Sequence, residues 1–341
     1  MRRALPGLLA LVLLACGGAS VPSGAGGHLT LRLGYLPNLT HAPALAGVRR
    51  GFFADKLGVG VTLRPVTFNA GPDTVEALLS GSIDAAYLGP NPALNAHARS
   101  HGRAVRIVSG ATSGGASLVV RPGIEAVTDM KGKVLATPQL GNTQDVALRS
   151  WLASRGLRAD LQGGGDVSIQ PQDNAQTLQA FRIGKIDGAW VPEPWATRMV
   201  IEGGGRLFLD ERDLWPNGRF VTTLLMVRAD FLQQHRDVVE DLLEGQVATD
   251  EYLHQQPGGA QRLVNDALAD ISGKRLPDQV VGSAWDRLEF TEDPIATSLR
   301  DSAERAEKLG LLPRVDLRGI YDLSLLNAVL TRHGQPAVRA L

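Results

Sequence analysis

The stretch TVEALLSGSIDAAYLGPNPAL, residues 74–94, returns in altered form as TLQAFRIGKIDGAWVPEPWAT, residues 177–197, a spacing of 103 residues. Seven of the 21 aligned positions are identical without a gap. Each copy predicts a helix ending at a glycine, an Ile-Asp step, a strand ending in an aromatic residue and a Pro-x-Pro exit. Two copies favour two similar lobes, because stacked repeat proteins usually need three or more units. The alternative is chance similarity between common α/β sequences.

The segments around the first copy alternate between strand and helix patterns. Leu31, Leu33 and Tyr35 alternate with polar or small residues, which predicts a strand. After a Pro-Asn loop, apolar residues fall at helical spacing at Ala44, Leu45 and Val48, and Gly51 is the expected stop. The pair Asp73 and Glu76 resembles a capping box and predicts a helix start at Asp73. Strands that alternate with helices predict an α/β fold with a mainly parallel sheet covered on both faces.

Length and composition narrow the classes of protein. A chain of 341 residues is long enough for two domains. Its 35 basic residues balance 35 acidic ones, and no basic run marks a nucleic-acid-binding surface. With 44% hydrophobic and 21% charged residues, the composition is that of a globular protein and excludes a disordered one.

The N-terminal residues have the pattern of a secretion signal. Residues 1–3 are MRR, and an apolar stretch of signal-peptide length then leads to Cys16. This pattern resembles a bacterial lipobox and predicts a lipoprotein signal peptide over residues 1–16, with lipidation of Cys16. The alternative is a plain secretory signal cut a few residues later. Residues 17–28 are small and unpatterned and predict a flexible tether.

Four stretches together carry a resemblance to a known family: GYLPNLTHAPALAG, LLSGSIDAAYLGPNPA, ATPQLGNTQDVALRSWL and IDGAWVPEPWA. They resemble the solute-binding proteins of ABC importers, in the sulfonate, nitrate and taurine group, over residues 29–310. The resemblance implies a two-lobed, periplasmic-binding-protein-like (type II) fold with two crossover hinge segments. It suggests lobe I over residues 29–117 and 222–341, and lobe II over residues 118–221.

The resemblance also implies the partners. They are a small anionic solute, the transmembrane subunits of an ABC permease with their ATPase, and the membrane, reached through the lipid anchor. We expect a monomer on the extracytoplasmic face, with an aliphatic sulfonate as the first candidate solute. Taurine, nitrate, bicarbonate and a thiamine precursor are alternatives. A ligand-sensing lipoprotein without a transport role is the alternative of a different class.

Ligands of open α/β sheets bind beyond the carboxyl ends of the strands, where helix N-termini favour anions. Candidate ligand-binding residues therefore lie in four loops at these ends: Asn38, Thr40, His41; Gly89, Pro90, Asn91; Gln139, Gly141, Asn142, Thr143, Gln144; and Glu193, Trp195. Thr40 can instead cap a helix, and the prolines can serve loop rigidity alone.

The first three loops contain no Lys or Arg, so an anion there would be held by neutral hydrogen bonds, which suits a sulfonate. Glu193 can bind a ligand amine or form an ion pair with Arg198. Trp195 can stack on a ligand or belong to the core.

Catalysis has little support in the sequence. His97 and His101 have the i, i+4 spacing of zinc ligands but no third ligand, and a solvated helix end explains them better. Neither a G-x-S-x-G nucleophile motif nor a Walker phosphate loop occurs. We therefore expect a binding protein that is not an enzyme and has no cofactor and no metal.

Overall fold

The computed structural model describes residues 28–341. The predicted signal peptide, Cys16 and the tether up to residue 27 lie outside the described residues, so lipidation stays a prediction. No helix within residues 28–341 is long and apolar enough to cross a membrane.

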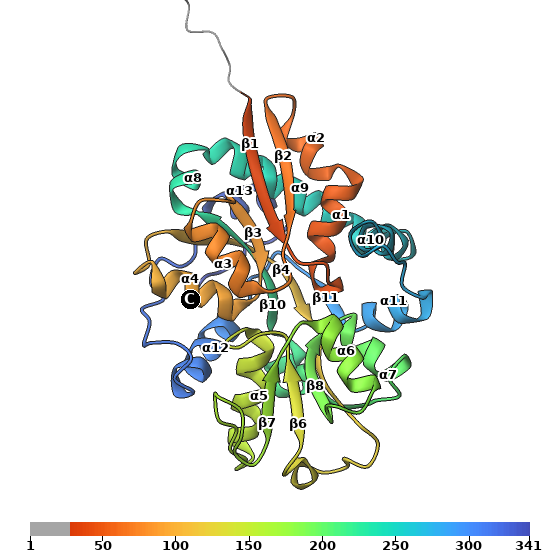
Figure 1. The fold of residues 1–341 in the computed structure, drawn as a ribbon. Helices are drawn as coiled ribbons and strands as arrows, with labels where there is room; N and C mark the ends of the chain where they lie inside the picture. The colour runs from red at the N-terminus through yellow and green to blue at the C-terminus, as the bar shows by residue number, and fades with distance from the viewer. Residues whose placement is uncertain (1–27) are drawn as a thin grey trace, which may run out of the picture.

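Two β-sheets form the centres of two lobes, drawn one above the other in Figure 1. The sheet of lobe I has the order β11 (Leu288–Phe290), β4 (Val105–Gly114), β10 (Val221–Arg228), β3 (Ala85–Leu88), β1 (Leu29–Tyr35), β2 (Val61–Thr67). The sheet of lobe II has the order β7 (Ser168–Pro171), β6 (Val134–Thr137), β8 (Gly188–Pro192), β5 (Ala116–Val120), β9 (Arg206–Asp210). The chain changes sheets between β4 and β5 and returns between β9 and β10.

The expectation of mainly parallel sheets is wrong. β1 pairs in parallel with β2 and β3, but β10 lies antiparallel between β3 and β4. In lobe II, β6 pairs in parallel with β7 and β8, while β5 is antiparallel to β8 and β9. The reason is the crossover itself. A strand that arrives from the other lobe starts at the cleft and runs away from it, against the strands that run toward it.

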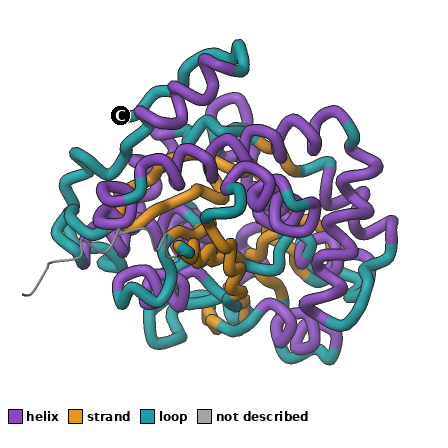
Figure 2. The backbone as a smooth tube through the Cα atoms, turned by 90° about the horizontal axis from the view of Figure 1, so that it is seen from above, coloured by secondary structure: helices purple, strands orange, loops and turns teal. Residues whose placement is uncertain are grey.

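Helices cover both faces of each sheet, as predicted, and surround the strands in the view from above (Figure 2). One face of the lobe I sheet packs on α1 (Ala42–Arg50), α2 (Phe52–Leu57), α8 (Ala229–Gln234), α9 (Arg236–Gln255), α10 (Pro257–Ser272), α11 (Asp278–Trp285) and α13 (Ser324–Arg332). The other face packs on α3 (Gly71–Leu79), α4 (Pro90–Arg99) and α12 (Ala296–Lys308). In lobe II, α5 (Thr143–Ser154) covers one face, and α6 (Asn174–Arg182) and α7 (Trp195–Ile201) cover the other.

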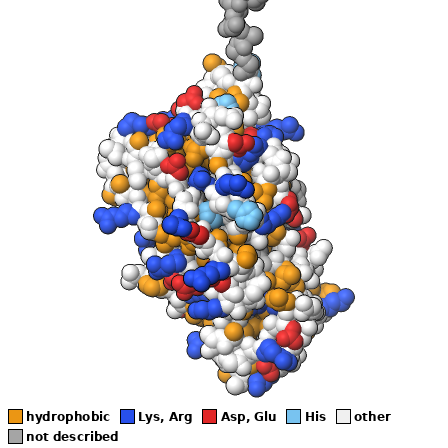
Figure 3. All heavy atoms as spheres, turned by 90° about the vertical axis from the view of Figure 1, so that its left-hand side faces the viewer, with side chains coloured by type: hydrophobic (Ala, Val, Ile, Leu, Met, Phe, Trp, Pro, Cys, Tyr) orange, Lys and Arg blue, Asp and Glu red, His pale blue; other side chains and the backbone are white. Residues whose placement is uncertain are grey.

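The side chains of β3 show why both faces need cover. Ala85 and Tyr87 enter one core, and Ala86 and Leu88 enter the other. On the outer surface, basic and acidic side chains lie beside one another on the face shown in Figure 3, in keeping with the formal net charge of zero.

The repeated stretch has the same structure in both lobes. α3 and α6 are followed by Gly81 and Gly184, with φ of 75° and 79°, a left-handed conformation that favours glycine. The Asp of the Ile-Asp step then binds the neighbouring strand. Asp84 accepts from the backbone N–H of Arg32 in β1, and Asp187 accepts from that of Val134 in β6, both at 2.9 Å. The two copies therefore share the same local structure, and not only a similar sequence.

Two local expectations need correction. α3 begins at Gly71 with Ala70 as its N-cap residue, so Asp73 lies inside the first turn and does not cap the helix. Pro72 explains the earlier start, because proline is favoured in the first turn of a helix. The first Pro-x-Pro is likewise no loop, since Pro90 and Pro92 both belong to the first turn of α4.

We predict that Asp84→Asn lowers the free energy of unfolding by about 1–3 kcal/mol, because the buried carboxylate accepts bonds from the Arg32 backbone N–H and guanidinium. Asp73→Asn, at an exposed position of the preceding helix α3, is the control and should change it by less than about 0.5 kcal/mol. Urea unfolding measures both. Equal effects would contradict a structural role for the Ile-Asp step.

Candidate functional site

A small cavity lies where the two lobes meet. Its volume is about 40 Å³, and it is lined by Leu36, Asn38, Thr40, His41, Gly71, Gly89, Pro92, Asn142, Thr143, Gln144, Pro192 and Thr222. Seven of the thirteen predicted ligand-binding residues are among these. The structure thus brings together residues from three of the four predicted loops, while the fourth contributes only Pro192.

Four helices begin at this cavity. His41 precedes α1, Gly71 is the first residue of α3, Gly89 is the N-cap of α4, and residues 142–144 are the N-cap and first turn of α5. The N-terminal N–H groups of a helix have no intrahelical partner, and the helix dipole places partial positive charge there. Four such ends around one small volume create a positive potential without a charged side chain.

The polar side chains of the cavity are neutral donors. Among its described lining residues none carries a full charge. Burial lowers the pKa of His41 to about 3, so its imidazole is neutral at physiological pH. His41 Nδ1 accepts the Leu36 backbone N–H at 3.4 Å, which leaves the ring proton on Nε2 as a donor. The buried Thr143 Oγ1 has no hydrogen-bond partner among the described residues.

Direct contacts between the lobes close the cavity. The Trp195 indole N–H donates to Asn38 Oδ1 at 2.8 Å, and the Leu39 backbone N–H donates to the Glu193 carbonyl at 3.0 Å. Gly89 lies so near Thr143 that a Cβ on it would be 2.4 Å from Thr143 Oγ1. The structure therefore describes the lobes in a closed arrangement.

The loop before α5 is held by a buried ion pair. The Asp145 carboxylate accepts from Thr137 Oγ1 and from the Gly141 backbone N–H, both at 2.9 Å. Arg149 Nε pairs with it at 3.0 Å, and both side chains are buried. These bonds fix the backbone that presents Thr143 to the cavity.

Four other predicted residues lie near the cavity without lining it. Pro90 is the first residue of α4, and Asn91 borders a neighbouring void of about 10 Å³ that also touches Thr143. Gln139 and Gly141 belong to the loop before α5, where the Gly141 N–H is bound to Asp145. Since these four residues do not line the cavity, their contact with a ligand stays a prediction.

Glu193 and Trp195 also lie outside the cavity lining, and the predicted ion pair between Glu193 and Arg198 is wrong. Arg198 instead pairs with Glu202 one helical turn further on, at 2.7 Å. Glu193 is fully buried, accepts from the backbone N–H and Oγ1 of Thr197, both at 3.0 Å, and faces Arg287 from lobe I at 3.5 Å.

The structure adds cavity residues that sequence reasoning missed: Leu36, Gly71, Pro92, Pro192 and Thr222. Gly71 had a usable signal, because it lies at the start of the helix that follows β2, as Gly89 lies at the start of the helix that follows β3. Thr222 had none, since β10 reaches the site only through the return crossover. The view of His97 as solvated is also wrong, because it is buried and its Nε2 lies 2.9 Å from the Asp316 carbonyl oxygen.

Comparison with known proteins gives evidence on the family of this chain that does not depend on the structure. The model of the NMT1-like family matches residues 24–266. The taurine-binding periplasmic protein of Escherichia coli (strain K12) is 25% identical over 289 residues, which cover 80% of this chain and 85% of that protein. These matches confirm the resemblance predicted from the four sequence stretches.

Two solved structures show the fold. The alkanesulfonate-binding protein SsuA from Xanthomonas axonopodis pv. citri, bound to MOPS, is similar with a TM-score of 0.69 and 22% identity, covering 84% of this chain and 94% of that one. The periplasmic nitrate-binding protein NrtA from Synechocystis PCC 6803 is similar with a TM-score of 0.76 and 16% identity, covering 92% of each chain. The predicted two-lobed binding-protein fold is confirmed.

We predict that Gly89→Ala opens the lobes, because the new Cβ would overlap Thr143 Oγ1, a type of overpacking that costs about 1–3 kcal/mol. The φ of −74° at Gly89 suits alanine, so the effect comes from the clash and not from the backbone. Small-angle X-ray scattering should show a larger radius of gyration. Gly282→Ala, where a Cβ meets nothing within 4 Å, is the control. Adding Thr143→Ala should restore closure, and a failure to do so would contradict the clash.

Proposed function

Since the chain belongs to the NMT1-like family, we propose that it is the solute-binding protein of an ABC importer and captures a small oxyanion between its lobes. The observation that carries this proposal is the uncharged cavity at which four helices begin. Relatives named for binding taurine, alkanesulfonates and nitrate support the same class of solute.

The chemistry of the cavity suits an anion that stays ionised. Helix N-termini, the His41 Nε2–H and the Thr143 hydroxyl can each donate to a ligand oxygen. A sulfonate or nitrate oxygen accepts several such bonds and needs no proton from the protein. Neutral donors also favour release, because the departing ligand leaves no unpaired buried cation behind.

The size and lining of the cavity favour a compact solute. A volume of about 40 Å³ holds roughly three water-sized groups, enough for a sulfonate head group or a nitrate ion in the closed arrangement. A short aliphatic sulfonate is therefore our first candidate. Nitrate is the second candidate, because a nitrate ion also fits this volume. Taurine is less favoured, because no carboxylate lines the cavity to bind its ammonium group.

The remaining elements of the proposal follow from the class of protein. Closure around the solute would present both lobes to a permease with its ATPase, and the lipidated Cys16 would hold the chain on the extracytoplasmic face of the membrane. A ligand-sensing lipoprotein would share the cavity but not the permease. We propose binding and not catalysis, because within residues 28–341 no nucleophilic side chain that lines the cavity is hydrogen-bonded to a general base.

A thermal-shift panel tests the proposal. Methanesulfonate, ethanesulfonate, nitrate, bicarbonate, taurine and a thiamine precursor are each added to the protein, since a solute that binds only the folded form raises the melting temperature. We expect the largest shift with a short sulfonate or nitrate, and a smaller one with taurine. No shift with any oxyanion would overturn the proposal.

We predict that Thr143→Val weakens binding of the best solute by roughly fivefold to tenfold, the worth of one hydrogen bond. Folding stability should stay equal or rise, because the hydroxyl removed is buried without a protein partner. Isothermal titration and urea unfolding measure the two quantities. Thr112→Val removes another buried, unpartnered hydroxyl that does not line the cavity, so it should leave affinity unchanged. Equal affinity loss in both variants would contradict a ligand contact by Thr143.

A further inference from the structure

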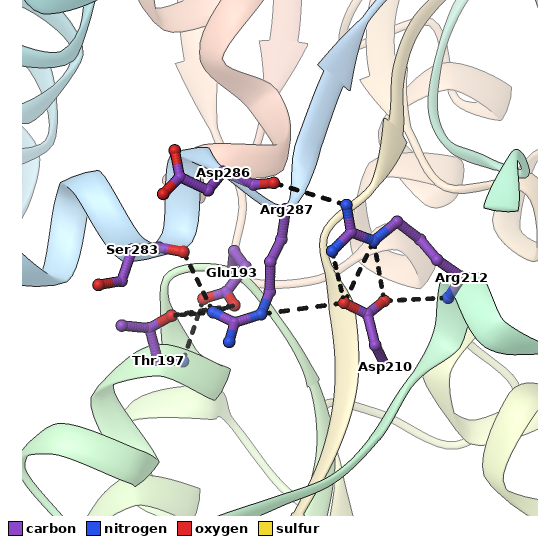
Figure 4. A network of polar contacts seen from close by, with 7 residues as sticks. All are labelled: Glu193, Thr197, Asp210, Arg212, Ser283, Asp286 and Arg287. Carbon is purple, nitrogen blue, oxygen red and sulfur yellow. Dashed lines mark hydrogen bonds and ion pairs between the residues drawn. The ribbon is translucent and has the colours of Figure 1, made fainter.

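A second contact between the lobes centres on Arg287, which follows α11 in lobe I (Figure 4). Its Nη1 donates to Thr197 Oγ1 at 3.1 Å and lies 3.5 Å from Glu193 Oε1. The same nitrogen donates to the Ser283 carbonyl at 3.1 Å, and Nε lies 3.9 Å from Asp210 of β9. One guanidinium from lobe I is therefore bound by three side chains of lobe II.

Two partners of Arg287, Asp210 and Glu193, adjoin the two crossovers between the lobes. Asp210 ends β9, where the chain turns back toward lobe I. The backbone N–H of Glu193 donates to the Gly115 carbonyl at 2.8 Å, and Gly115 is the residue between β4 and β5. Arg287 thus lies close to both crossovers, just after α11, a helix of lobe I that contacts α7 of lobe II.

The segment of residues 192–197, which contains Glu193, forms part of the cavity wall and of the contact between the lobes. Pro192 lines the cavity, the Glu193 carbonyl binds the Leu39 N–H, and Trp195 binds Asn38. Arg287 itself does not line the cavity. Arg287 pairs with the side chain of Glu193. The main-chain carbonyl of Glu193 accepts the hydrogen bond from Leu39, in the loop of lobe I that carries Asn38.

Charge explains why Glu193 needs this partner. Its carboxylate is fully buried, and burial raises its pKa to about 7 even though Thr197 and Arg287 act in the opposite direction. The other charged groups that face the pair are Asp210, which adds repulsion, and Arg212, which is bound to Asp210 at 2.8 Å. Without Arg287 the buried Glu193 would keep only hydrogen bonds from Thr197.

We propose that Arg287 is a positioning residue for lobe closure, which partners the buried Glu193 across the cleft and so fixes the 192–197 segment against the cavity. The inference rests on the proposed function only in taking the lobes to open and close. A cavity of about 190 Å³ beside the pair, lined also by Val200, Ile201 and Leu207, lies between α7 and α11 there. Opening would join this space to solvent and hydrate Glu193.

The direction of the pH effect follows from this hydration. In the closed form the pKa of Glu193 is raised to about 7, and in an open form it would fall toward its ordinary value of 4.5. Closure therefore takes up a proton, is fully favoured below about pH 4.5, and weakens as pH rises through 7. Arg287 limits that weakening, because it stabilises the ionised carboxylate.

The test measures lobe separation without any solute. Spin labels at Glu304→Cys on α12 and Ser154→Cys on α5, both exposed positions, report the distance across the cleft in a full-length Cys16→Ser chain. We expect Arg287→Met to raise the closed-form pKa of Glu193 by about one unit, which lowers the closed-to-open ratio roughly fivefold at pH 8 and less than twofold at pH 5.5. Arg228→Met, whose ion pair with Asp230 lies within lobe I and whose exposure is similar, is the control and should not change the ratio.

Glu193→Gln supplies the second arm. It should flatten the dependence of the ratio on pH between 5.5 and 8, and in that background Arg287→Met should change the ratio by less than twofold. Equal effects of Arg287→Met at both pH values, or an unchanged pH profile in Glu193→Gln, would overturn the proposal. If Arg287→Met does not fold, the profile of Glu193→Gln alone decides. Because no solute is present, these outcomes are separate from success or failure of the thermal-shift panel.

Discussion

The direction of the strands at the cleft is the constraint on which the rest of the structure depends. β1 and β3 of lobe I and β6 and β8 of lobe II are parallel within each sheet, and their carboxyl ends lead toward the other lobe. A helix that follows such a strand must begin at the cleft. The N-terminal N–H groups of several helices are therefore gathered at one place by topology alone, before any side chain is considered.

This constraint explains how a cavity without charged residues can attract an anion. A buried Arg or Lys would bind more strongly, but it would also need a partner whenever the cavity is empty. Helix ends and the neutral His41 carry only partial charges, so the desolvation cost in the empty state is small. The buried carboxylates of this region lie outside the cavity lining, where protein groups pair with them: Asp145 with Arg149 within lobe II, and Glu193 with Arg287 of lobe I in the closed arrangement.

Local patterns predicted those parts of the molecule that depend on nearby residues. The two lobes, the helices after each strand and the loops around His41, Gly89 and Thr143 could all be predicted, because each follows from hydrophobic periodicity and turn residues within one βα element. The antiparallel course of β5 and β10 could not, since it depends on which lobe the chain has just left. Nor could the partner of Glu193, because Arg287 lies 94 residues away and follows a helix with no sequence signal of its contact.

The difference between the two copies of the repeat shows how one element has acquired two roles. In the alignment, Gly89 and Pro192 occupy the same position, and both line the cavity. The next position is Pro90 in one copy, which starts α4 at once, and Glu193 in the other, where the helix begins two residues later at Trp195. That delay leaves room for a side chain that turns away from the cavity toward α11. The first copy therefore supplies a close, sterically limited approach between the lobes, and the second supplies the buried acid that makes their contact sensitive to charge.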